Sequence, residues 1–88
     1  MGKIIRRATA GTLESSDVFV TLEPASGLEI EIDSVVQKQF GEAIRKVAEE
    51  TLKELDIHEG RLSIVDRGAL DYVIRARVET AVLRGKGE

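Results

Sequence analysis

The chain has 88 residues, so it can form one small domain (residues 1–88) around a single modest core; we expect residues 1–7 and 85–88 to be loose. It contains no cysteine, which excludes a disulfide framework, a zinc–thiolate site and a thiol nucleophile of its own. A formal net charge of −3 with only 3% aromatic residues argues against a nucleic-acid partner. No apolar run reaches the roughly 18–20 residues of a membrane span, and no signal peptide is present, so we expect no membrane contact and a cytoplasmic location.

Three strands are predicted in the first part of the chain. Residues 4–14 form a loose β-like run that is clearer over 8–14, where Gly11 suggests a bulge or a close approach. In residues 18–23, Val18, Val20 and Leu22 share one face, and in residues 28–33 apolar and polar side chains alternate completely. A Pro24–Gly27 turn separates them, which favours an antiparallel meander with one wet face. The inward positions are Val18, Val20, Leu22, Leu28, Ile30 and Ile32.

The period then changes from 2 to 3.6, which predicts a helix over about residues 34–55 with Asp33 or Ser34 as its N-cap. A fourth strand is predicted at 61–65, and a second helix at about 68–84 with Asp66 as its N-cap. The order is therefore β-β-β-α-β-α. It indicates an α+β fold in which two helices pack on one face of an antiparallel sheet of about four strands.

The chain is poorly equipped to act as an enzyme by itself. Its one histidine, His58, lies in the connector after the first helix, where an exposed loop residue is a simpler reading than a general base. Glu29, Glu31 and Asp33 point to one face of a strand, but such a row is usually the wet side of a sheet and not a metal site. No phosphate-binding glycine motif is present.

Two serines are candidates for covalent attachment. Ser34 follows Asp33 just before a predicted helix, like the pantetheine site of ordinary acyl carriers, but those are all-helical and a strand leads into this site; we interpret Ser34 as a cap. Ser15 lies with Ser16 at the tip between the first two strands, where a two-residue link would fit a tight hairpin. Loop tips tolerate bulk, yet the residues alone favour an ordinary polar turn.

Three separated blocks resemble the acyl carrier (gamma) subunit of citrate lyase. They are residues 10–15 (AGTLES), residues 38–41 with 43–45 (KQFG, AIR), and residues 66–71 with 75–77 (DRGALD, RAR). The resemblance implies that Ser15 carries phosphoribosyl-dephospho-coenzyme A through a phosphodiester. Ser16 stands where family members often have glycine, so its hydroxyl is the fallback attachment site.

The same resemblance implies a non-catalytic carrier subunit. Its arm would hold acetyl and citryl thioesters between an alpha (acyl transferase) and a beta (acyl lyase) subunit during cleavage of citrate to oxaloacetate and acetate, after loading by a prosthetic-group transferase. Arg75 and Arg77 could meet arm phosphates or a partner, or form surface salt bridges. The alternatives are a malonate decarboxylase type of carrier and an unmodified interaction domain.

Overall fold

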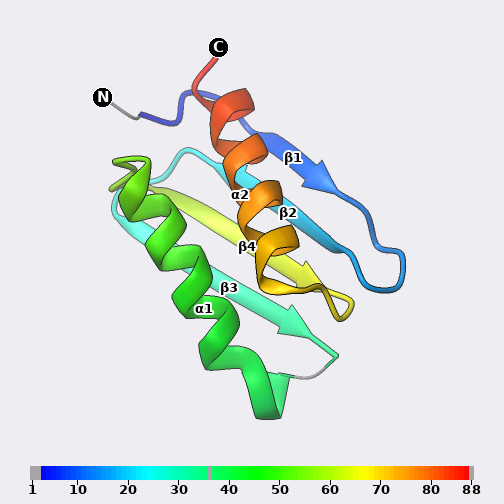
Figure 1. Ribbon diagram of the computed structural model, residues 1–88. Coiled ribbons are helices and arrows are strands. Elements are labelled where there is room, and N and C mark those ends of the chain that lie inside the picture. Colours follow the sequence, from blue (N-terminus) through cyan, green and yellow to red (C-terminus); the bar gives the residue numbers. More distant parts are fainter. Residues whose placement is uncertain (1–2, 36, 88) are drawn as a thin grey trace.

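A four-stranded sheet carries two helices on one face (Figure 1). The computed structural model describes residues 3–35 and 37–87. The predicted α+β class and element order are confirmed. The elements are β1 (Ala8–Gly11), β2 (Val18–Glu23), β3 (Leu28–Ser34), α1 (Gln37–Glu54), β4 (Gly60–Asp66) and α2 (Asp71–Gly85). No helix in these residues is long and apolar enough to cross a membrane.

The sheet is mixed, with strand order β1-β2-β4-β3. β2 pairs antiparallel with β1 and β4, whereas β3 pairs parallel with β4. The antiparallel meander predicted for the first three strands is therefore wrong at the third. The reason is that α1 carries the chain back along the sheet, so that β3 and β4 run in the same direction. Alternation within a strand specifies its faces but not its neighbours.

The core lies between the sheet and the helices. Val20 faces Ile64 and Leu22 faces Leu62 across the β2–β4 pairing, and all four are buried. The helices cover them with apolar side chains at four-residue steps: Ile44, Ala48 and Leu52 from α1, and Ile74, Val78 and Val82 from α2. On the edge strand β3 the predicted inward positions are less enclosed, because this strand has a neighbour on one side only: Ile30 and Ile32 are half-buried and Leu28 is exposed.

The predicted helix caps are corrected by the structure. Asp33 and Ser34 both belong to β3, and Asp66 is the last residue of β4. The Ser34 hydroxyl donates to the Asp66 carboxylate at 2.8 Å, and the Ala69 N–H donates to its other oxygen at 2.9 Å. Asp66 is 1% exposed, so its carboxylate needs these donors. α2 follows Leu70, which makes no side-chain capping bond.

Near the termini, two segments expected to be loose contact each other. The N–H groups of Ile5 and Arg6 donate to the Gly85 carbonyl at 2.9 and 3.3 Å. Ile4 is buried against the end of α2, where a Cβ on Gly85 would lie 3.3 Å from it. Apolar burial at Ile4 thus holds residues 4–6 against Gly85. Figure 1 shows the first part of the chain beside the C-terminal end of α2.

Candidate functional site

Ser15 lies in the loop of residues 12–17, which joins β1 to β2. The Asp17 N–H donates to the Glu14 carbonyl at 3.1 Å, so residues 14–17 form a turn with Ser15 and Ser16 at its centre. Both serines are exposed. The predicted two-residue hairpin link is thus the tip of a longer loop, since the strands stop at Gly11 and resume at Val18.

Ser16 has a positive φ of 66°. The third position of a type II turn requires this conformation, which glycine adopts without a clash of Cβ. The backbone therefore gives a physical reason for glycine to be favoured at this position. Ser15 precedes it, and within the described residues no side chain or backbone group bonds to the Ser15 hydroxyl.

Asp17 holds the base of the loop. Its carboxylate accepts hydrogen bonds from the Thr12 hydroxyl at 2.7 Å, from Nε and Nη2 of Arg77 at 3.1 and 3.0 Å, and from the Val18 N–H at 2.7 Å. The bond from Thr12, then those from Arg77 and Val18, lower the pKa of Asp17 to about 2, outweighing the opposing effect of burial. The loop is therefore clamped by a carboxylate that stays ionised.

Gly11 allows the strands to approach closely beside this clamp. Its φ is +90°, and a Cβ there would lie 1.8 Å from the Val18 carbonyl oxygen and 3.2 Å from Cδ of Arg77. The close approach predicted for Gly11 is confirmed. Only glycine fits this position without displacing the backbone.

The loop also rests on the turn that follows β4. The Ser16 N–H donates to the Arg67 carbonyl at 2.8 Å, and the Arg67 N–H donates to the Asp17 carbonyl at 2.9 Å. Figure 1 shows the two segments at the same end of the molecule. The Arg67 side chain is exposed, and it has no ion-pair partner among residues 3–35 and 37–87. Two of the sequence blocks, residues 10–15 and 66–71, thus meet around Ser15.

The other sequence candidates lie elsewhere. His58 pairs with Asp56 at 2.6 Å before the start of β4, whereas the Ser15 loop lies beside its end at Asp66. The length of β4, about 20 Å, separates the two sites. Ser34 bonds to Asp66 and is not at a helix start. Among the described residues no group of three or more His, Asp or Glu side chains could hold a metal ion.

The two arginines with open roles both form ion pairs. Arg77 binds Asp17 as described above, and Arg75 pairs with Glu54 of α1. A salt bridge was one of the roles predicted for Arg77, but the sequence did not indicate Asp17 as its partner. Opposite charge was the only signal for this contact in the sequence. Local sequence pattern cannot predict a contact between residues 60 positions apart. The side chains of residues 38–40, the first three of the second block, lie outside the described part of the structure.

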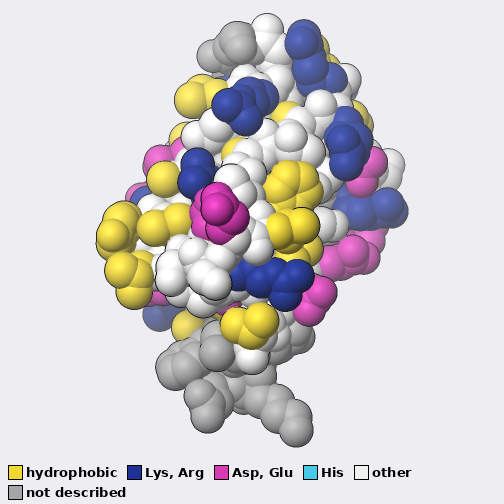
Figure 2. Space-filling model, turned by 90° about the vertical axis from the view of Figure 1, so that its right-hand side faces the viewer, with side chains coloured by type: hydrophobic (Ala, Val, Ile, Leu, Met, Phe, Trp, Pro, Cys, Tyr) yellow, Lys and Arg dark blue, Asp and Glu magenta, His cyan; other side chains and the backbone are white. Residues whose placement is uncertain are grey.

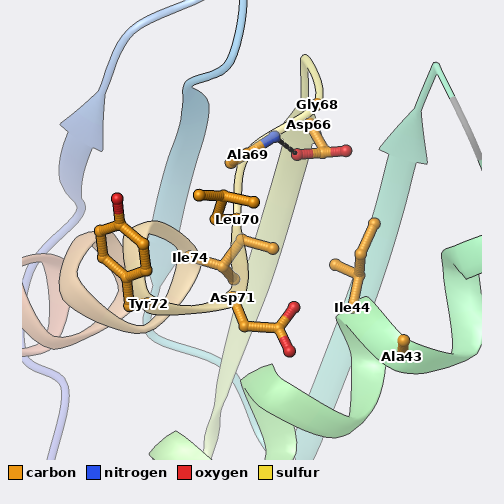
Figure 3. Close-up of a pocket in the computed structure, with 9 residues that line it drawn as sticks. All are labelled: Ala43, Ile44, Asp66, Gly68, Ala69, Leu70, Asp71, Tyr72 and Ile74. Carbon is orange, nitrogen blue, oxygen red and sulfur yellow. Dashed lines mark hydrogen bonds between the residues drawn. The ribbon is translucent and has the colours of Figure 1, made fainter.

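A mostly apolar groove of about 750 Å³ opens next to the loop. It runs from the N-terminal half of α1 across the start of α2 (Figure 3). Its lining residues are Ala43, Ile44, Asp66, Gly68, Ala69, Leu70, Asp71, Tyr72 and Ile74. Figure 2, which views the molecule from the right-hand side of Figure 1, shows several exposed hydrophobic side chains at this end. Leu70 is 62% exposed and Tyr72 is 70% exposed. No pattern in the sequence indicates this groove.

Comparison with known proteins places the chain among acyl carriers. Residues 5–85 match the acyl carrier family model described as malonate decarboxylase delta subunit (MdcD). The citrate lyase acyl carrier protein of Cronobacter sakazakii is 58% identical over 83 residues, covering 93% of this chain and 86% of that protein. The corresponding protein of an Enterobacter species is 55% identical, covering 98% and 90%.

The fold is also found in a solved structure, that of a Pseudomonas malonate decarboxylase hetero-tetramer in complex with malonate. One of its chains matches with a TM-score of 0.79 at 24% identity, over 96% of this chain and 91% of that chain. At this level of identity the likeness shows a shared fold.

Proposed function

The chain belongs to the family of citrate lyase acyl carrier proteins, and we propose that it is the carrier subunit of a citrate lyase with phosphoribosyl-dephospho-coenzyme A attached to Ser15. The observation that carries the choice of Ser15 is its position: an exposed hydroxyl at the tip of a loop whose base is firmly held. A bulky group can be joined there without disturbing the core.

The surroundings of Ser15 fit a phosphodiester. Arg67 contacts the serine turn through its backbone, and its exposed guanidinium has no ion pair in the described residues. A cation beside the loop favours a negatively charged linkage. Ser16 is the fallback, but its N–H is fixed on Arg67 and its φ is strained, so Ser15 is the better candidate.

The chain's own residues hold the prosthetic group and present it to the partners, but they do not activate the serine for attachment. His58, the one histidine, is remote from Ser15, so the base that deprotonates the serine comes from the prosthetic-group transferase. The bound group supplies a thiol that holds acetyl and citryl as thioesters for the alpha (acyl transferase) and beta (acyl lyase) subunits. The clamped loop keeps the attachment point fixed, and tethering raises the effective concentration of substrate at each partner.

A malonate decarboxylase type of carrier is the second candidate, because the matching family model bears that description. The 49–58% identity to citrate lyase carriers favours citrate chemistry. An unmodified interaction domain is the third candidate. Purification of the chain from its native host with its associated subunits distinguishes the first two, since the partners differ in their activity on citrate and malonate.

Attachment is tested by intact mass after co-expression with the modifying enzymes. We expect the added mass of the group on the wild-type chain, none on Ser15→Ala, and full loading of the matched Ser16→Ala control. Loading of Ser15→Ala with loss on Ser16→Ala would assign the neighbouring hydroxyl. An unmodified wild-type chain under these conditions would contradict the carrier proposal and favour the unmodified interaction domain. Protein made without the modifying enzymes should be unmodified in every case.

A further inference from the structure

Two exposed apolar side chains stand at the rim of the groove nearest the serine loop. In Figure 3, Tyr72 lies on the side of α2 away from α1, and Leu70 lies between it and Ile44. Tyr72 is the chain's single tyrosine, and it is 70% exposed. Burying the aromatic ring of Tyr72 is favourable, and within the described residues the core does not bury it. Such a rim suits a flat, uncharged ring.

We infer that the Leu70–Tyr72 rim binds the adenine of the prosthetic group, with the base stacked on Tyr72. This inference rests on the proposed attachment at Ser15. Bases of all kinds stack on aromatic side chains, so an exposed tyrosine beside an apolar residue offers a surface suited to this chemical class.

The attachment point lies within reach of the rim. The serine turn is bonded to Arg67 through the Ser16 N–H, and three residues of chain, at most about 10 Å, separate Arg67 from Leu70. The phosphate and sugars between a serine oxygen and the purine span roughly ten covalent bonds, on the order of 10 Å. The base is therefore the first large apolar part of the group that can meet the groove.

The charges at the groove favour the base over the phosphates. Asp71 lies in the groove lining, and its carboxylate points toward the space between the helices in Figure 3. Asp66 adds a second carboxylate to the lining. Both disfavour phosphate inside the groove, whereas Arg67 lies next to the serine turn outside it. The groove therefore favours the neutral base, whereas the phosphate groups of the arm are expected to stay outside it.

Binding of the base would fix the part of the arm between Ser15 and the base. Only the pantetheine, which ends in the thiol, would then move freely. The attachment at Ser15 and the contact at Tyr72 fix the first part at two points. The pantetheine beyond the base remains free to enter partner sites. The carrier gains a defined starting position for the arm, which limits the volume that the thioester searches.

Tyrosine fluorescence tests this inference directly, because the chain has one tyrosine and no tryptophan. The unmodified and the loaded protein are compared after loading has been verified by intact mass. We expect the emission of Tyr72 to fall by about half on loading, because stacking with a base quenches it. The difference should disappear in urea. Unchanged emission in protein that carries the full added mass overturns the inference and leaves the proposed function standing.

Two matched variants locate the contact. Leu70→Ser removes the apolar neighbour of Tyr72 while placing a favourable capping residue before α2, so the fold is maintained. Leu83→Ser makes the same change at an exposed position, 51% exposed, near the far end of α2. We expect the quenching to weaken in Leu70→Ser and to persist in Leu83→Ser. Equal quenching in both variants would place the base elsewhere, and absence of the added mass from the wild-type chain would overturn the proposed function itself.

Discussion

Arg77 of α2 forms two hydrogen bonds, at 3.1 and 3.0 Å, with the carboxylate of Asp17, which lies 60 residues earlier in the loop that carries Ser15. The two-bond geometry fixes the direction of both side chains. Asp17 is only 14% exposed, whereas Arg77 is 40% exposed, so water screens the pair in part. The last helix therefore controls the position of a loop formed at the start of the chain.

Arg77→Ala should lower the free energy of unfolding by about 1–2 kcal/mol, because it leaves the half-enclosed Asp17 carboxylate without two of its donors. The measurement is urea denaturation followed by circular dichroism. Arg75→Ala is the matched control on the same helix, since its pair with Glu54 lies at the exposed surface; we expect little change. A larger loss for Arg75→Ala than for Arg77→Ala would contradict the clamp.

The pH dependence of stability should report Asp17. Its folded pKa of about 2 lies below the ordinary value of 3.8, so the ionised form is favoured in the folded state. The resulting stabilisation, at most about 2 kcal/mol, is complete above pH 3.8 and is lost as the pH falls toward 2. NMR titration of the Asp17 carboxyl carbon measures the pKa. In Arg77→Ala the pKa of Asp17 should rise. An unchanged pKa in this variant would show that Arg77 does not stabilise the ionised form of Asp17.

Gly11→Ala should destabilise the fold strongly, by about 3 kcal/mol or more, because the new Cβ would lie 1.8 Å from the Val18 carbonyl oxygen. Gly27→Ala is the matched control: its φ of +78° is similarly unfavourable, but no atom lies within 4 Å of its added Cβ. We expect a cost of about 1 kcal/mol there. Thermal melts compare the two, and equal melting temperatures would argue against a close approach at Gly11.

Ser34→Ala should reduce stability by about 1–2 kcal/mol, because it removes a donor to the buried carboxylate of Asp66. The same change at exposed Ser26 should have little effect. Neither variant should lose the prosthetic group, because neither serine lies in the loop of residues 12–17. Loss of the added mass in Ser34→Ala, with its fold intact by circular dichroism, would reassign the attachment site.

Local sequence pattern was sufficient to predict the order of the elements and the family. Local periodicity alone predicts which side chains share a face. The period of 2 places Val18, Val20 and Leu22 on one face of a strand, the helical period places Ile74, Val78 and Val82 on one face of a helix, and all six are buried. The three sequence blocks, two of which meet around Ser15, predicted an acyl carrier, and the citrate lyase acyl carrier relatives confirm that family.

Which elements lie side by side follows from the folded arrangement and not from local pattern. The parallel pairing of β3 with β4, the clamp between Asp17 and Arg77, and the use of Ser34 as a donor to Asp66 each join distant positions. Opposite charges and hydroxyls occur at many positions in the chain, so local pattern cannot choose among the possible partners. The groove likewise exists only because residues of α1 and of the start of α2, far apart in the sequence, line the same space.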